Sequence, residues 1–175
     1  MEHLKYPIGK YVAQPFSEQL LSEWLLAIEA LPNQVEATVQ NLDAAQLQTP
    51  YRPEGWTVHQ LVHHIADSHT NAYIRFKLGL TEDNPVIKPY NENAWAKMAD
   101  TQNLPINISL TILHAIHLRW WHVLKAITPA EWERTIYHPE HQQTMTLWYL
   151  LGMYVWHGRH HTAHITSLRN RMGWF

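Results

Sequence analysis

Apolar residues recur every three or four positions along most of this chain, the spacing that lines one face of an α-helix. The pattern is sustained in four stretches, over about residues 17–42, 57–78, 106–127 and 147–171. The alternating pattern of a half-buried strand is confined to short segments. Four long amphipathic helices predict an all-α fold, namely a four-helix bundle with short extra helices.

The first stretch begins after Ser17, a residue type that caps helices. Its apolar positions keep helical spacing and are Leu20, Leu21, Trp24, Leu25 and Ile28. Proline is disfavoured inside a helix but suits the first turn, so Pro32 predicts a break near Leu31 and a second helical piece. The residues before Ser17 include two prolines and a glycine, and we expect them to be irregular.

The connections between the other helices carry turn signals. Residues 79–90 are broken by glycine and proline and predict a loop, followed by a short helix near 94–98. Residues 128–131, Thr-Pro-Ala-Glu, form a capping box with proline at the first turn, which predicts a brief helix. Residues 135–137 and 144–146 could pair as a small hairpin.

Composition limits the classes of function. The 175 residues fit one domain spanning 1–175, and no apolar run reaches membrane-spanning length. A net charge of −2 with 16% charged residues offers no basic face, so we expect no nucleic-acid partner. The start of the chain lacks the apolar stretch of a signal peptide, which predicts a cytoplasmic protein. Without cysteine, any metal site must use His, Asp or Glu.

Histidines concentrate in the last predicted helix, where two pairs have i, i+4 spacing. One pair is His157 and His161, the other His160 and His164. Either pair can present two imidazoles to one ion, and spacing alone does not choose between them. Imidazoles that only share hydrogen bonds at the edge of the core are the alternative.

A third ligand must come from another helix. The second helix offers His59, His63, His64 and His69, and His64 is the candidate. It flanks the apolar face in a polar row with Thr57, Ser68, Asn71 and Arg75. Such a row beside a core face is typical of a helix that lines a polar cavity. A half-exposed surface histidine is the alternative for His64.

Several motifs in one order resemble the YfiT-like branch of the DinB superfamily. They extend from residues 6–9 almost to the C-terminus and include residues 55–69, 73–78, 80–85, 88–90, 117–120, 138–140 and 154–165. The resemblance implies a four-helix bundle that holds one divalent ion, zinc or nickel, through three histidines. By that resemblance, and not by spacing, the ligands are assigned to His64, His160 and His164. Similar proteins are dimeric, which implies a homodimer.

Four neighbouring residues are candidates for supporting roles. Asp67, one turn after His64, could orient a ligand imidazole or could be a solvated carboxylate. His117 lies at the centre of the third helix's apolar face, where a hydrogen-bonded core histidine is favoured over a cavity-lining group or a fourth ligand. His157 and His161 adjoin the assigned ligands and are candidates for positioning or proton transfer.

Three neutral ligands would leave an ion its full charge and an open coordination position, as in catalytic zinc sites. If water fills that position, its pKa falls toward about 7 and hydrolysis of a small molecule follows. If a low-molecular-weight thiol such as bacillithiol fills it, as in similar proteins of the superfamily, the reaction is thiol S-transfer. A non-catalytic metal-binding bundle is a third reading. The substrate itself is not specified by any residue.

Overall fold

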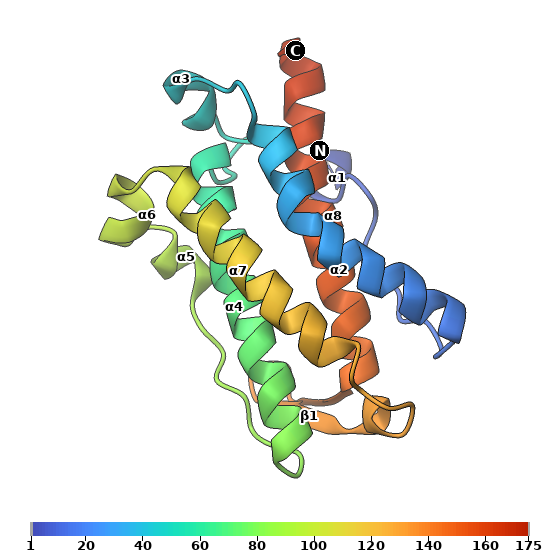
Figure 1. The fold of residues 1–175 in the computed structure, drawn as a ribbon. Coiled ribbons are helices and arrows are strands. Elements are labelled where there is room, and N and C mark those ends of the chain that lie inside the picture. Colours follow the sequence, from blue (N-terminus) through green and yellow to red (C-terminus); the bar gives the residue numbers. More distant parts are fainter. Residues whose placement is uncertain (1, 175) are drawn as a thin grey trace.

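The computed structural model describes residues 2–174. Four long helices form its frame: α2 (Glu18–Val39), α4 (Val58–Thr81), α7 (Ile106–Leu124) and α8 (Leu147–Met172). Helix α7 packs on α2 and α4, and α8 packs on the same two helices from the other side (Figure 1). The predicted four-helix bundle is therefore confirmed.

Short elements close the ends of the bundle. Helices α5 (Glu92–Trp95) and α6 (Ala99–Asn103) lie beside α4, and α3 (Ala44–Leu47) lies near the C-terminal end of α8 (Figure 1). A 3-10 turn, η1 (Glu131–Glu133), precedes the antiparallel strands β1 (Thr135–His138) and β2 (Gln143–Thr146). The brief helix and the hairpin expected from the sequence are both present, and the hairpin leads directly into α8.

Side-chain caps fix where the long helices begin. Ser17, Thr57 and Thr146 each accept a hydrogen bond from a backbone N–H of the following turn. Gln60 completes a capping box at the start of α4. Gly173 ends α8 in a left-handed conformation, which glycine adopts without steric cost.

Two expectations about helix boundaries were wrong. Helix α2 runs unbroken through Pro32, and residues Glu2–Lys5 form a short helix, α1, inside the segment expected to be irregular. Pro32 is buried in the interface between helices, so packing offsets the loss of one helical hydrogen bond. The missing N–H leaves the carbonyl of Ile28, four residues earlier, free for another donor.

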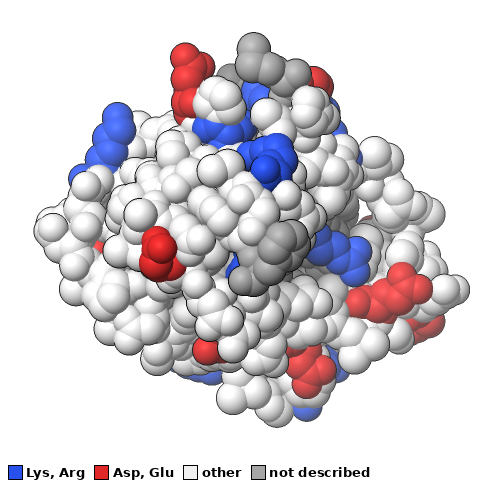
Figure 2. All heavy atoms as spheres, turned by 90° about the horizontal axis from the view of Figure 1, so that it is seen from above, with Lys and Arg blue, Asp and Glu red and all other residues white. Residues whose placement is uncertain are grey.

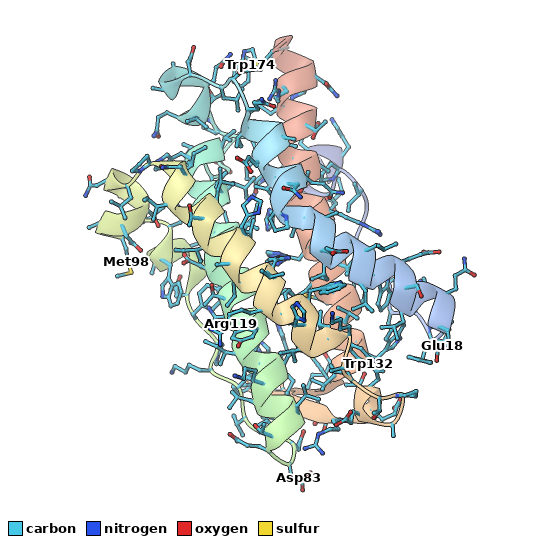
Figure 3. The ribbon with its side chains drawn as sticks, viewed as in Figure 1. Glu18, Asp83, Met98, Arg119, Trp132 and Trp174 are labelled. Carbon is cyan, nitrogen blue, oxygen red and sulfur yellow. The ribbon has the colours of Figure 1, made fainter. Side chains whose placement is uncertain are left out.

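The core divides into two apolar clusters along the bundle axis. The larger lies toward the hairpin and includes Trp120, Trp132 and Phe76, each fully buried. Figure 3 shows Trp132 at that end of the bundle. The smaller cluster joins α2, α4 and α8 near the opposite end and includes Val35, Leu61 and Ile165. Buried histidines of α4, α7 and α8 lie near the two clusters.

Charged side chains are scattered over the surface. On the face shown in Figure 2, lysines and arginines alternate with acidic residues and uncharged ones, and no patch of one sign forms. No helix in residues 2–174 is long and apolar enough to cross a bilayer.

Candidate metal centre

Helices α4 and α8 bring His64 together with His157 and His161. His157 and His161 are one turn apart on α8, and His64 lies in the second turn of α4. The Nε2 atom of His157 is 3.2 Å from Nε2 of His64 and 3.1 Å from Nε2 of His161. Nitrogens bound tetrahedrally to one ion at 2.0–2.1 Å lie about 3.3 Å apart. The three imidazoles therefore have nearly the spacing of three ligands.

A second group of histidines adjoins the first and shares His161. It contains His160 and His164, whose Nε2 atoms are 3.0 Å apart. All three members come from α8 alone. Burial and the His160 ring lower the pKa of His164, and the nearby charges of Arg52 and Arg171 lower it further. Two nearby cations oppose the binding of a third. No arginine or lysine charge contributes to the shifted pKa values of the first group. Its members come from two facing helices, α4 and α8.

Burial keeps the imidazoles of the first group uncharged. It lowers the pKa of His64 to about 4, and it lowers the pKa values of His157 and His161 well below the ordinary value. The neighbouring imidazoles lower both of the latter further. A neutral imidazole has a free lone pair, which is the form that binds a metal ion.

Two further histidines connect His157 to the backbone of α2. His117 Nδ1 lies 2.6 Å from the carbonyl of Ile28, and His117 Nε2 lies 2.8 Å from His69 Nδ1. His69 Nε2 in turn lies 3.2 Å from His157 Nδ1. This series of hydrogen-bonded imidazoles crosses the bundle from α2 through α7 and α4 to α8. It starts at the carbonyl of Ile28, which Pro32 leaves without a helical donor.

The direction of these hydrogen bonds follows from the carbonyl, which can only accept. His117 must donate from Nδ1, so its neutral ring accepts at Nε2. His69 therefore donates from Nδ1 and accepts at Nε2. His157 then donates from Nδ1, which leaves the lone pair of its Nε2 facing His64 and His161. Burial lowers the pKa values of His117 (to about 4) and His69, so both rings remain neutral as this sequence of bonds requires.

Replacing His69 by leucine should weaken metal binding without removing a ligand. The His157 ring would lose the acceptor that fixes its tautomer and orientation, and such outer partners are worth about 10- to 100-fold in metal affinity. Competition with a chelator measures the change. His63→Leu is the matched control, since His63 is buried on the same helix but bonds to Ser109 and Leu104. Equal affinities in the two variants would contradict this role of His69.

The structure places the other predicted residues as follows. His160 and His164 pair with each other and do not join His64 in one group of three. His157 and His161, expected as neighbours, are the residues that meet His64. Asp67 is half-buried with its carboxyl near Asp100, and burial and that charge raise its pKa to about 6. His117 is the hydrogen-bonded core histidine that was favoured, and it is also part of the chain of imidazoles.

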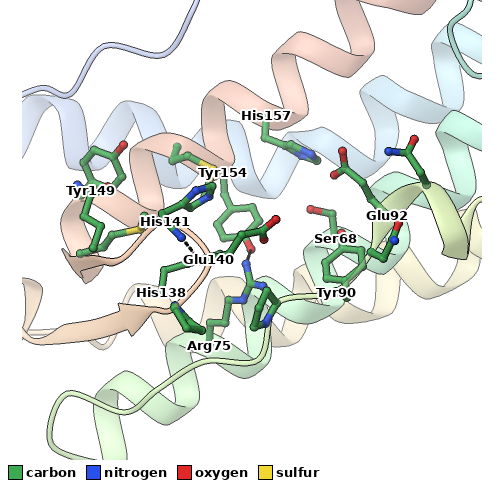
Figure 4. A pocket seen from close by; sticks show the side chains of 17 residues that line it. Ser68, Arg75, Tyr90, Glu92, His138, Glu140, His141, Tyr149, Tyr154 and His157 are labelled. Atoms are coloured by element: carbon green, nitrogen blue, oxygen red, sulfur yellow. Dashed lines mark hydrogen bonds between the residues drawn. The ribbon is translucent and has the colours of Figure 1, made fainter.

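Two cavities reach His157. The larger, of about 1090 Å³, extends from His157 past Tyr154 and Arg75 to the hairpin end (Figure 4). The smaller, of about 360 Å³, also touches His64 and His161. Glu92 lines both cavities beside His157. The polar row predicted on α4 thus lines cavities, through His64, Ser68 and Arg75. An ion bound by the first group would be accessible to a small molecule.

Three residues of the site were not assigned a role from the sequence. His69 was only one of four histidines offered by the second helix, because nothing in the sequence shows that its ring faces His117 across the bundle. Arg75 was noted only as a member of the polar row. Glu92, which lines both cavities, had no predicted role. The proline inside α2 was a usable signal, since it leaves a buried carbonyl that needs a donor.

Known proteins share both the sequence and the fold. A family model described as the DinB superfamily matches residues 27–165. A protein of Bacillus mycoides strain KBAB4 and one of Bacillus cereus strain ATCC 10987, each named "Putative metal-dependent hydrolase", are 50% identical over 175 residues, covering 99% of this chain and all of theirs.

A solved structure is similar over 99% of both chains, with a TM-score of 0.96 and 45% identity. It is YfiT from Bacillus subtilis, described as "a probable metal-dependent hydrolase with an unusual four-helix bundle topology". The matching residues include α4 and most of α8, which supply the histidines of both groups. The chain therefore belongs to the DinB superfamily and is a YfiT-like member of it.

Proposed function

We propose that this protein is a metal-dependent hydrolase in which His64, His157 and His161 hold one divalent ion. The observation that carries the proposal is the convergence of their three ligand atoms, all within 4.8 Å of one another. An all-imidazole donor set suits zinc or nickel and not magnesium or calcium, which take oxygen ligands. The names of the relatives support the same class of reaction.

The residues around the group suit hydrolysis. A divalent ion, when bound, supplies Lewis-acid activation of water and leaves a position open beyond the three imidazoles. The cavities at His157 admit a substrate to that side. Glu92 lines both cavities that reach His157, and we assign it the role of accepting a proton. Partial loss of hydration inside the cavity, and then the charge of Glu140, raise the pKa of Glu92, which makes it a better base.

The test compares metal-free with zinc-loaded and nickel-loaded protein on a panel of small esters and amides, each with and without a low-molecular-weight thiol. We expect hydrolysis that needs the metal and does not need the thiol. Glu92→Gln should lower kcat by about 100-fold or more while metal content stays the same. Turnover only with thiol would instead identify a transferase. No turnover, with a metal-dependent rise in Tm, would identify a non-catalytic bundle.

A further inference from the structure

A buried arginine without an acidic partner lies in the larger cavity. Arg75 projects from α4 and is 8% exposed. Its guanidinium donates to the hydroxyl of Tyr154 at 2.8 Å and to the carbonyl of Lys88 at 3.3 Å. Its Nε–H is buried and has no hydrogen-bond partner. Within residues 2–174 no carboxylate lies at ion-pair distance from it.

This arrangement leaves a charge and donors unsatisfied. The two acceptors are neutral and use two of the five N–H groups of a guanidinium. An isolated buried charge is costly unless an opposite charge and further hydrogen bonds balance it. The planar fork of arginine matches an oxyanion, which can accept two parallel bonds. The Arg75 charge acts on the cavity wall: burial and His141 lower the pKa of His138, and Arg75 lowers it further. The missing partner is therefore expected to be an anion that enters the cavity.

The acidic residues of the cavity limit the class of anion that it can bind. Glu92 and Glu140 line the cavity, and both are exposed. The charge of Glu140 raises the pKa of Glu92, which shows that the two act on each other. Two carboxylates in the wall of the cavity repel a doubly charged phosphate more strongly than a singly charged carboxylate.

The distance to the metal group limits the size of the substrate. Tyr154, which bonds Arg75, precedes His157 by three residues on α8, and their ring centroids are 6.1 Å apart. Figure 4 shows Arg75 and His157 on opposite sides of the Tyr154 ring. The guanidinium bonds the hydroxyl end of Tyr154, so it lies farther from His157 than the 6.1 Å between the two ring centroids. A substrate bound at both points would have its acid group several bonds from the reacting bond.

We propose that the substrate is a small ester or amide with one carboxylate group, and that Arg75 binds this carboxylate. The reaction of this substrate rests on the proposed hydrolase function, whereas the binding of its carboxylate by Arg75 does not. Arg75 is thus a specificity-determining residue, and the carbonyl of Lys88 remains a partner of its guanidinium when the Tyr154 hydroxyl is absent. Binding the acid there directs the neighbouring ester or amide carbonyl toward His157.

Paired substrates test the preference. 4-Nitrophenyl hydrogen succinate and its methyl ester differ in one negative charge. We expect zinc-loaded protein to favour the acid by about 10- to 100-fold in kcat/KM, through KM, as a charge-assisted hydrogen bond allows. Arg75→Gln should remove the preference. Tyr154→Phe removes the arginine's hydroxyl partner but keeps its charge, and it should retain the preference. Loss of preference in Tyr154→Phe equal to that in Arg75→Gln would overturn the assignment.

A binding measurement separates this inference from the hydrolase proposal. Metal-free protein is titrated with butyrate or with inorganic phosphate while the Nε–H signal of Arg75 is followed by NMR. Butyrate should shift that signal at lower concentration than phosphate does. A shift without any ester hydrolysis would contradict the hydrolase and support the carboxylate site. Hydrolysis at equal rates for both esters, with no shift, or stronger binding of phosphate, would overturn the carboxylate site alone.

Discussion

His157→Ala and His161→Ala are each expected to lose bound metal, while His160→Ala and His164→Ala retain it. The first two variants remove one of three ligands, so the loss should exceed the about 10- to 100-fold that an outer partner costs. His160 and His164 contact each other and lie outside the group that contains His64. Metal content after dialysis, by mass spectrometry on protein without a histidine tag, measures the difference.

The four variants form a matched set, because each removes a buried or half-buried imidazole from the same helix. General damage to α8 would lower metal content in all four. Loss confined to His160→Ala and His164→Ala would restore the ligand set implied by family resemblance. His64→Ala should lose the metal in either case, so it confirms that an ion is bound but does not choose between the pairs.

The metal-free protein is expected to lose stability steeply as the pH falls from about 6.5 toward 5. Burial lowers the pKa values of His64 and His117 to about 4 from an ordinary value of 6.5. Over this window the unfolded chain binds more protons than the folded one, so acid favours unfolding. At pH 5 each of these two residues removes about 2 kcal/mol of the stability present at neutral pH.

Other buried histidines add to the loss. The pKa values of His69, His157 and His161 are lowered well below the ordinary value, so their contributions have the same sign. Urea unfolding at several pH values measures the slope. His117→Gln should flatten it, whereas replacement of the exposed His3 should not. Saturating zinc should oppose the loss, because the ion binds only the folded, deprotonated site. A slope that is the same in His117→Gln as in the wild type would contradict this account.

Local signals in the sequence were sufficient for most of the fold. The spacing of apolar residues located four helices, and Ser17 marked the start of the first. The threonine-rich segments before the last helix paired as expected. The error at Pro32 had a physical cause: tertiary packing and a histidine donor from α7 compensate for the hydrogen bond that proline removes. Such compensation depends on a neighbouring helix and is invisible in local sequence.

The site was harder to predict because it depends on how helices are rotated against each other. The pair His157 and His161 has the same spacing as the pair His160 and His164. The second pair is displaced by three residues, a rotation of about 300°, so the two pairs point in directions only about 60° apart. Only the packing of α4 against α8 distinguishes the pair that meets His64. The same holds for His69, whose bonds reach His117 on α7 and His157 on α8.

Anomalous diffraction from crystals of the zinc-loaded protein, recorded at the zinc absorption edge, would locate the ion. We expect one strong peak with Nε2 of His64, His157 and His161 each about 2.0–2.1 Å away. A peak between His160 and His164, or no peak at the His64 group in crystals that contain zinc, would contradict it.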